Sequence, residues 1–311
     1  MGGILVIKLG ALGDFTQACG PFQAIRDYHV NEKITLLTTE PFFSMALASN
    51  YFDDVWVDER PAVLDWLGWL RLRRRLQTAN FRRVYDLQTS DRTAIYYRLF
   101  GRASVPEWSG IARRCSHPHK NPSRDQMHTL DRQSEQLAVA GINNVPPPNL
   151  DWFRSDLGRF KLPNRYALLV PGGAPGRRNK RWSARQFGEL ANKLVKTDVR
   201  VFLIGQKTEG FLHSQIALEA EGVISLAGKT TLADVAELGR CTVVSVGNDT
   251  GPMHILATGG HPTFVLFGDG SDPSLCAPRG ENVECLISNN HGDIRNLSVN
   301  QVWAAIAPSL G

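Results

Sequence analysis

Short apolar runs alternate with amphipathic segments along the first third of the chain. Ile4–Leu9 is rich in β-formers, and an amphipathic segment runs from about Thr16 to His29. The alternation continues with Ile34–Thr38, Pro41–Asn50, Val55–Val57, Pro61–Gln77, Val84–Leu87 and Arg92–Phe100. This rhythm of strand and helix predicts a parallel sheet covered by helices.

Two segments interrupt the rhythm. Glu107 to Gln126 collects Pro, Ser, His and Arg and predicts a long loop, which a helix near His128–Ala140 follows. Asn143 to Asn164 is proline-rich, with VPPPN within it, so it cannot be the interior of a helix. We therefore expect an interdomain linker here, and a chain of 311 residues is long enough for two domains, residues 1–150 and 151–311.

The rhythm restarts after the linker. The expected elements are Tyr166–Val170, Ala184–Lys196, Val199–Ile204, Glu209–Ala220, Val223–Ile224, Leu232–Arg240, Val243–Val246, Gly251–Ala257, Thr263–Phe267, Val283–Ile287 and Ser298–Ala307. The fold class is thus α/β, with two Rossmann-like domains. Facing each other, they would bring both sets of strand carboxyl ends to one cleft, where ligands of open α/β sheets bind.

Composition narrows the class of protein. Hydrophobic residues make up 42% of the chain and charged residues 21%, as in ordinary folded proteins. The longest apolar runs are strand-sized, far below the roughly 20 residues of a membrane span, and Lys8 interrupts the first, which argues against a signal peptide. The five cysteines are spread without a CxxC pair, so we expect a cytoplasmic protein.

Charge and metal-ligand patterns give weaker indications. The net charge is +5, and Arg71, Arg73, Arg74, Arg75, Arg82 and Arg83 occur with no acidic residue among them. Such a patch suits phosphate, carboxylate or a membrane surface. Cys115, His117 and His119 form a CxHxH run, but no second cluster at zinc spacing accompanies it, so we favour a polar loop and expect no metal.

Three segments with chemical potential lie where a strand ends and a helix begins. The first, Gly10 to Asp14, lacks the G-x-G-x-x-G spacing of a dinucleotide site. Asp14 could be a helix N-cap, or a carboxylate held at a cleft and ready to accept a proton. From this segment alone the cap is favoured.

The second segment, Pro171 to Ser183, is a loop of small residues followed by Arg177, Arg178, Lys180 and Arg181. It does not match G-x-x-x-x-G-K-[ST], which disfavours a Walker NTPase. A loop with Gly172, Gly173 and cations before a helix start still suits phosphate, although a solvated basic loop explains it equally well.

The third segment, Gly247 to His254, follows the apolar strand TVVSV. Pro252 suits a first helical turn, so the N–H groups of Thr250 and Gly251 would point outward at an anion. Asp249 and Thr250 could merely cap this helix, but Asp, Thr and His together exceed what a cap requires.

Together these segments resemble glycosyltransferase family 9, the ADP-heptose:lipopolysaccharide heptosyltransferases. The resemblance rests on ILVIKLGALGDFTQACGPFQAIR, on the proline-glycine loop through KRW, and on GNDTGPMHILA leading into PTFVLFG. HTLDRQSEQLAVAGI, from His128 to Ile142, is also similar to the family. The segment FGDGSDPSLCAPRG departs from the usual pattern.

The resemblance implies a GT-B fold, with the acceptor on the N-terminal domain and the nucleotide sugar on the C-terminal one. It implies inverting transfer without metal or other cofactor. Asp14 would then be the general base, Lys180 would contact the donor phosphates beside Arg181, Gly172, Gly173, Thr250 and Gly251, and Asp249 would bind sugar hydroxyls. His254, a turn further along, is a further candidate for the donor site, and a packed structural histidine is an equal alternative.

The acceptor side is less defined. The segment VLDWLGWLRLRRRL, residues 63–76, places Trp69, Leu72 and Leu76 on one helical stripe and Arg71, Arg74 and Arg75 on a neighbouring one. This segment could dock on the inner membrane or bind acids of a glycolipid acceptor, or it could simply pack on its sheet with a solvated arginine face. Arg113 and Arg114 are further candidates for the acceptor.

The expected function is transfer of heptose from ADP-heptose to a lipopolysaccharide-core-type acceptor. Alternatives are a GT-B transferase that uses a UDP- or GDP-sugar and a nucleotide-sugar-binding protein without turnover. A nicotinamide oxidoreductase is disfavoured because neither half has the fingerprint glycines. Nucleic acid is not an expected partner. The expected location is the cytoplasm, including the cytoplasmic face of the inner membrane.

Overall fold

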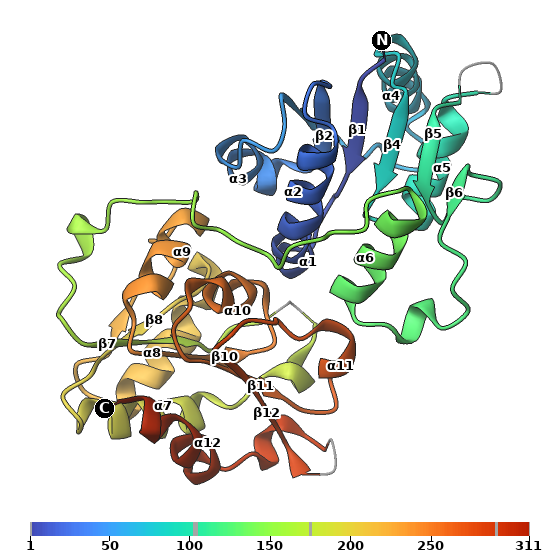
Figure 1. Ribbon diagram of the computed structural model, residues 1–311. Coiled ribbons are helices and arrows are strands. Elements are labelled where there is room, and N and C mark those ends of the chain that lie inside the picture. The colour runs from blue at the N-terminus through green and yellow to red at the C-terminus, as the bar shows by residue number, and fades with distance from the viewer. Residues whose placement is uncertain (1, 102–104, 174–175, 290–291, 311) are drawn as a thin grey trace. The chain divides into compact units, whose positions relative to one another are not determined.

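The computed structural model describes residues 2–101, 105–173, 176–289 and 292–310. The chain divides into two compact units, Met1–Asn149 and Leu150–Gly311, each with its own sheet (Figure 1).

The N-terminal unit is built on a parallel sheet in the order β3-β2-β1-β4-β5-β6. Its strands are β1 (Ile4–Ile7), β2 (Ile34–Thr38), β3 (Asp54–Val57), β4 (Arg83–Asp86), β5 (Glu107–Gly110) and β6 (His117–Pro118). Its α-helices are α1 (Leu12–Gln17), α2 (Cys19–Tyr28), α3 (Phe43–Ala48), α4 (Trp66–Thr78), α5 (Asp91–Leu99) and α6 (Thr129–Val139).

Helices cover both faces of this sheet, which explains why its central strands are apolar without alternation. All four residues of β1 are fully buried. Leu5 and Ile7 belong to a core cluster with Leu76 of α4 and Tyr96 of α5. Alternate strand residues point to opposite faces, so the other two residues of β1 face the side of α1, α2 and α6, which contact one another.

Three of the expected elements of this unit are wrong in part, and one of them, Pro61–Gln77, is helical only from Trp66 onward. The segment predicted as a loop, Glu107 to Gln126, contains the two short strands β5 and β6. Trp108 explains the first of them, because its fully buried side chain packs against Tyr97 and Phe100. The first helix begins four residues earlier than predicted, and it is divided into α1 and α2 at Ala18.

The C-terminal unit has a second parallel sheet, in the order β12-β11-β10-β7-β8-β9. Its strands are β7 (Tyr166–Val170), β8 (Arg200–Leu203), β9 (Ile224–Ser225), β10 (Val244–Asn248), β11 (Thr263–Phe267) and β12 (Val283–Ile287). Its α-helices are α7 (Ala184–Val195), α8 (Gly210–Glu219), α9 (Leu232–Cys241), α10 (Gly251–Leu256), α11 (Pro273–Cys276) and α12 (Val299–Ile306).

The two sheets have the same topology. Counted within its own unit, each sheet has the order 3-2-1-4-5-6 of a Rossmann fold, because β7 to β12 repeat the arrangement of β1 to β6. In this order the second and third strands lie on one side of the first strand, and the fourth lies on its other side. Ligands of such sheets bind at the carboxyl ends of those strands, so the loops after β1, β4, β7 and β10 are where a site is expected.

Candidate functional site

Asp14 lies in the loop-to-helix transition after β1. It is the third residue of α1, half-buried, and its Oδ2 atom accepts a hydrogen bond from the backbone N–H of Ala11 at 3.2 Å. Ala11 itself is the N-cap residue, so the alternative that Asp14 occupies this position is wrong. The carboxylate therefore accepts a hydrogen bond at the start of α1 and is still partly exposed to solvent.

A cavity of about 620 Å³ opens at Asp14. Its polar lining comes from the ends of several strands of the N-terminal unit: Asp14, Thr39, Arg60, Gln88, Ser90, Asp91 and Arg92. Gln88 fixes one wall, because its side-chain oxygen accepts from the backbone N–H of Leu9 at 2.8 Å. A carboxylate at the third position of a helix thus shares one hollow with two guanidinium groups.

Buried Asp58 organises the two arginines of this cavity. Its Oδ1 atom accepts from the backbone N–H of Arg60 at 2.9 Å, and its Oδ2 atom accepts from the Tyr96 hydroxyl at 2.5 Å. Arg92 donates to the same hydroxyl at 3.3 Å and to the carbonyl of Pro61 at 3.2 Å. Sequence reasoning missed Arg60 and Arg92, although both follow the carboxyl end of a strand, which is the signal that could have found them.

Two buried ionisable groups lie behind the loop that carries Asp14. Lys8 donates from Nζ to the carbonyl of Leu87 at 3.1 Å, and burial lowers the pKa of this amine while the charge of Asp14 raises it. Burial raises the pKa of Asp86 to about 6. The Oδ1 atom of Asp86 accepts from the N–H of Thr89 at 2.9 Å, and its Oδ2 atom has no hydrogen-bond partner among the described residues.

In the C-terminal unit, Asn248 joins the loop after β7 to the KRW segment. Its side-chain amide donates to the carbonyls of Pro171 at 2.8 Å and Gly172 at 3.1 Å, and its Oδ1 atom accepts from the N–H of Trp182 at 3.0 Å. The Trp182 ring is buried in the core and donates to the carbonyl of Leu297 at 2.7 Å. The backbone that follows Lys180 and Arg181 is therefore anchored to the core of the unit through Trp182.

The structure brings together two of the predicted donor-site residues. Lys180 Nζ lies 2.7 Å from Asp249 Oδ2, and both side chains are largely buried. The Lys180 stem passes so close to Gly270 that a Cβ atom there would lie 2.5 Å from Lys180 Cγ. Cys276 Sγ lies 4.0 Å from the same carboxylate oxygen. The segment that departs from the family pattern, residues 267–280, thus forms part of this site.

The other residues of the glycine loop are held by their neighbours. The N–H of Gly173 donates to Glu209 Oε1 at 3.1 Å, and Arg181 donates from Nη2 to the carbonyl of Gly173 at 2.6 Å. A Cβ atom at Gly172 would lie 1.9 Å from Glu209 Oε1, so a side chain there would displace the Glu209 carboxylate. Ala174 and Pro175 of the predicted phosphate loop lie outside the described residues. Sequence reasoning missed Glu209.

The start of α10 is not capped by a side chain. Thr250 is its N-cap residue, but its hydroxyl makes no hydrogen bond within the described part of the chain. Asp249 pairs with Lys180 instead of capping, so the alternative that these two residues serve only as caps is wrong. Gly251 begins the helix, and His254 is buried one turn further on.

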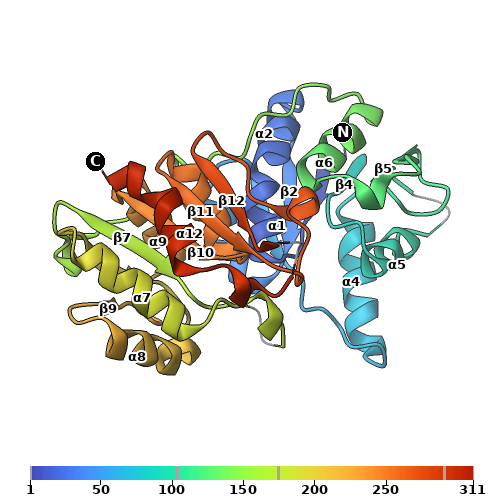
Figure 2. The same cartoon turned by 90° about the horizontal axis from the view of Figure 1, so that it is seen from below.

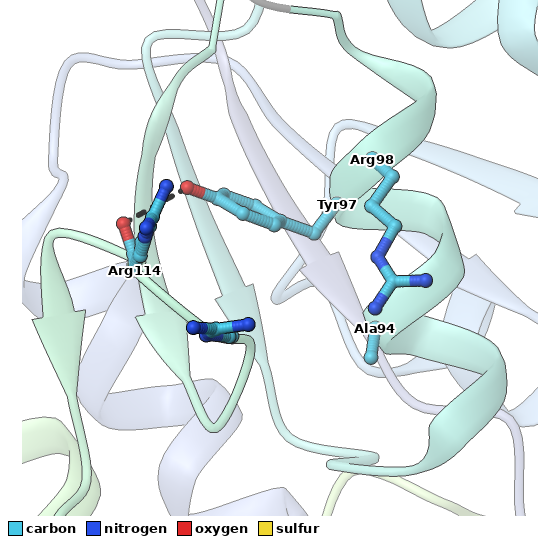
Figure 3. Close-up of a pocket in the computed structure, with 5 residues that line it drawn as sticks. Ala94, Tyr97, Arg98 and Arg114 are labelled. Atoms are coloured by element: carbon cyan, nitrogen blue, oxygen red, sulfur yellow. Dashed lines mark hydrogen bonds between the residues drawn. The ribbon is translucent and has the colours of Figure 1, made fainter.

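The arginines predicted for the acceptor lie outside the cavity of Asp14. Arg71 pairs with exposed Glu59 at 3.4 Å, Arg75 stacks 4.0 Å above the Trp56 ring, and Arg74 is exposed on α4. Arg113 and Arg114 line a smaller cavity of about 250 Å³ with Arg98 and Tyr97. Figure 3 shows Tyr97 between Arg114 and Arg98, with its hydroxyl donating to the Arg114 carbonyl at 3.0 Å.

No three His, Cys, Asp or Glu side chains gather as metal ligands in the described ranges. The CxHxH run is divided between other contacts. Cys115 donates to the carbonyl of Gly110, and His119 lies 3.2 Å from a carboxylate oxygen of Glu135 and 3.1 Å from the Arg124 guanidinium.

Comparison with known proteins finds a protein family that matches most of the chain. The profile of glycosyltransferase family 9 (heptosyltransferase) matches residues 69–303. The chain is 23% identical to the lipopolysaccharide core heptosyltransferase OpsX of Haemophilus influenzae, over 85% of this chain and 78% of that one.

Solved structures share the fold over nearly the full length of the chain. A family 9 glycosyltransferase from Veillonella parvula superposes with a TM-score of 0.84 at 18% identity, covering 99% of this chain and 97% of that one. The E. coli heptosyltransferase WaaC with ADP-2-deoxy-2-fluoro heptose superposes with a TM-score of 0.75 at 20% identity, covering 98% and 99%.

Two Rossmann-type units and these structural neighbours define the GT-B type of fold. The chain belongs to glycosyltransferase family 9.

Proposed function

We propose that this protein transfers heptose from ADP-heptose to an anionic, lipopolysaccharide-core-type glycolipid acceptor, with inversion and without a metal ion. Family membership supports the sugar, because relatives are named as lipopolysaccharide heptosyltransferases. A structural neighbour was solved with a fluorinated ADP-heptose, which supports the nucleotide. The observation that carries the proposal is a carboxylate, Asp14, that opens into a cation-lined cavity at the end of β1.

Asp14 is the proposed general base. The acceptor hydroxyl oxygen would form a bond to the anomeric carbon, the bond from that carbon to the diphosphate oxygen would break, and the hydroxyl proton would pass to Asp14. The attacking oxygen and the leaving diphosphate must then lie on opposite faces of the sugar, which gives inversion. The family profile begins at residue 69, beyond Asp14, so this role rests on geometry and on the N-terminal resemblance.

The donor diphosphate is proposed to bind beside Lys180. Negative charge grows on the leaving group during transfer, and a fixed cation lowers the energy of that state. Lys180 is held in place by Asp249. Arg181 donates to the carbonyl of Gly173, and the carbonyl of Gly172 accepts from Asn248. Asp249 is proposed to exchange part of its contact with Lys180 for sugar hydroxyls, with Thr250 and Gly251 next to the phosphates. His254 receives no role.

The acceptor is proposed to bind in the cavity of Asp14. Arg60 and Arg92 supply two cations there, which suits the carboxylate or phosphate groups of an anionic glycan. The predicted contacts Arg71, Arg74, Arg75, Arg113 and Arg114 are retained as outer contacts for a larger acceptor. The proposed location is the cytoplasm at the inner membrane; all five cysteines are free, as expected in a reducing compartment.

The first experiment compares Asp14→Asn with wild type. A general base contributes roughly 10²- to 10⁴-fold to rate, so transfer from ADP-heptose should fall by about that factor while ADP affinity stays unchanged. Asp27→Asn, an exposed carboxylate of α2 that does not line this cavity, is the control and should retain the wild-type activity. If Asp14→Asn keeps its transfer rate, the base assignment is wrong.

A second experiment addresses the alternatives of a UDP- or GDP-sugar and of binding without turnover. Calorimetric titration with ADP, UDP and GDP in EDTA should give the tightest binding for ADP. Tighter binding of UDP or GDP would move the protein to another sugar. Binding of ADP with no turnover of ADP-heptose on any core acceptor would favour the non-catalytic alternative.

A further inference from the structure

Large apolar side chains are exposed together at the start of α4. Val63, Leu64 and Trp66 are 88%, 90% and 66% exposed, and Leu67 and Leu70 are about half exposed. These five residues are called the apolar patch. Apolar surface gathered in this way on a folded protein marks a site of interaction with a partner or a membrane. No helix among the described residues is long and apolar enough to span a bilayer.

The local structure holds the apolar patch outward. Gly68 and Leu76 of α4 are buried against the unit, whereas Trp66, Leu67 and Leu70 lie on the opposite side of the helix. The segment before the helix is fixed as well, because Asp65 caps the N–H of Gly68 at 2.9 Å and Trp69 donates to the Ala62 carbonyl at 3.0 Å. Figure 2 shows the start of α4 at the lower margin of the N-terminal unit.

Arginines follow the apolar patch along the same helix. Arg73 and Arg74 are exposed and form no ion pair in the part of the chain that the structure describes. Arg71 pairs with exposed Glu59 at 3.4 Å, and such a surface ion pair contributes little. A helix that begins apolar and continues cationic is complementary to an anionic bilayer surface, where acyl chains lie below a layer of phosphates.

The apolar patch is continuous with the cavity of Asp14. Arg60 lines that cavity and precedes Val63 by three residues, a span of at most about 11 Å. Arg92, which also lines the cavity, donates to the Pro61 carbonyl at 3.2 Å. A surface that docks at the apolar patch therefore lies beside the opening at which Asp14 is reached.

We propose that the apolar patch, with Arg73 and Arg74, docks this protein on anionic lipid bilayers. Trp66 and the leucines enter the interface between headgroups and acyl chains, and the arginines contact lipid phosphates. Docking does not depend on the proposed function. The added consequence, that a lipid-linked acceptor is delivered next to Asp14, rests on the proposed function.

Vesicle co-sedimentation tests the docking. Wild type should bind phosphatidylglycerol/phosphatidylethanolamine vesicles, with affinity falling as salt rises, and should bind phosphatidylcholine vesicles weakly. Leu64→Gln/Leu67→Gln should bind the anionic vesicles about tenfold or more weakly, because two large apolar side chains are removed. Arg73→Gln/Arg74→Gln should also bind more weakly, and only on anionic vesicles. The matched control is Phe211→Gln/Leu218→Gln, which removes two exposed apolar side chains of the C-terminal unit and should bind like wild type.

Three outcomes would overturn the proposal. Wild type could fail to bind anionic vesicles, or the Leu64/Leu67 variant could bind as the control does. Light scattering could instead find a dimer that the Leu64/Leu67 variant dissociates, which would assign the apolar patch to a second copy of the chain.

Transfer assays separate this proposal from the proposed function. The Leu64/Leu67 variant should act on a water-soluble, delipidated acceptor at the wild-type rate and lose activity only on acceptor embedded in vesicles. If wild type transfers to neither acceptor, the proposed function fails while the vesicle result still stands. Equal loss on both acceptors would contradict delivery by docking.

Discussion

Lys8 and Asp86 place opposite charges under the loop of the N-terminal unit that carries Asp14. Both side chains are almost completely buried, and Lys8 senses both Asp14 and Asp86. The buried Lys8 ammonium therefore interacts electrostatically with two carboxylates: Asp14, which lines the cavity, and Asp86, which does not line it. Because an unpaired charge in the interior is costly, the protonation of Asp86 should be visible in the stability of the fold.

Asp86→Asn tests this expectation. Burial raises the pKa of Asp86 from 3.8 to about 6, so the folded state holds the proton more tightly than the unfolded state between these values. The contribution of Asp86 to the free energy of unfolding is then greatest at low pH. It is lost as the pH rises from about 4 to about 6, and it amounts to about 3 kcal/mol at most. In Asp86→Asn this loss should be absent.

Urea unfolding of both proteins at pH 4, 5, 6 and 7 measures the difference. Asp91→Asn, whose carboxylate is exposed, serves as the control and should follow wild type. Parallel pH profiles for wild type and Asp86→Asn would contradict the assignment.

Substitutions of Lys180 and of Asp249 should change the affinity for ADP in opposite directions. Lys180→Met removes the cation proposed to meet the diphosphate, so ADP affinity should fall about 10- to 100-fold. Asp249→Asn removes a carboxylate that competes with the phosphates for Lys180, so ADP should bind severalfold more tightly while transfer of the sugar slows. Calorimetry with ADP and a transfer assay measure the two effects. Weaker ADP binding in Asp249→Asn would show that the carboxylate supports the phosphate site.

At the scale of elements, strands with continuous apolar runs were predictable, and the polar strands β5 and β6 were not. The runs of β1, β7 and β11 are buried on both faces, so composition alone indicates them. β5 and β6 are short, lie at one side of the sheet and contain Glu107, Ser109 and His117. Their pairing depends on β4 and on the burial of Trp108, which local sequence does not encode.

The same distinction applies to the candidate site. Asp14, Lys180 and Asp249 follow strand ends and belong to motifs, so sequence indicated all three. Asn248 is the last residue of β10, and its partners lie 66 to 77 positions away in the chain. Its role depends on the alignment of β10 beside β7, which becomes known only when the sheet is formed.

Asn248→Ala should therefore weaken the link between β10 and the loop after β7. The substitution leaves two buried carbonyls and one buried N–H without their partner, at a cost of about 2–4 kcal/mol in the free energy of unfolding. Ser245→Ala is the matched control on the same strand, because its buried hydroxyl has no partner among the described residues. Urea unfolding should separate the two variants, and equal stabilities would contradict the role of Asn248.

At the scale of the whole molecule, each unit has its own sheet and its own apolar core. If the donor nucleotide binds only to the C-terminal unit, its effect should be local. ADP at 100 times its Kd adds about 2.7 kcal/mol to the state that binds it, so amide exchange should slow by up to about 100-fold within residues 150–311.

Exchange measured by mass spectrometry should change most near Gly172 and Asn248 and remain unchanged in residues 2–101. GDP at the same concentration is the control, and it should protect less. Protection of the N-terminal unit by ADP would contradict a donor site confined to one unit.

The repeated 3-2-1-4-5-6 strand order has a consequence for evolution. A chain composed of two copies of one topology is what duplication of an ancestral single-sheet gene would leave, with each copy free to diverge in its strand-end loops. On the proposed function, mutations after β1, β3 and β4 would alter what receives the sugar, while the loops after β7 and β10 would keep what donates it. Recombination at the boundary near residue 149 would exchange one specificity and inherit the other, so new glycans can arise by shuffling halves as well as by point mutation.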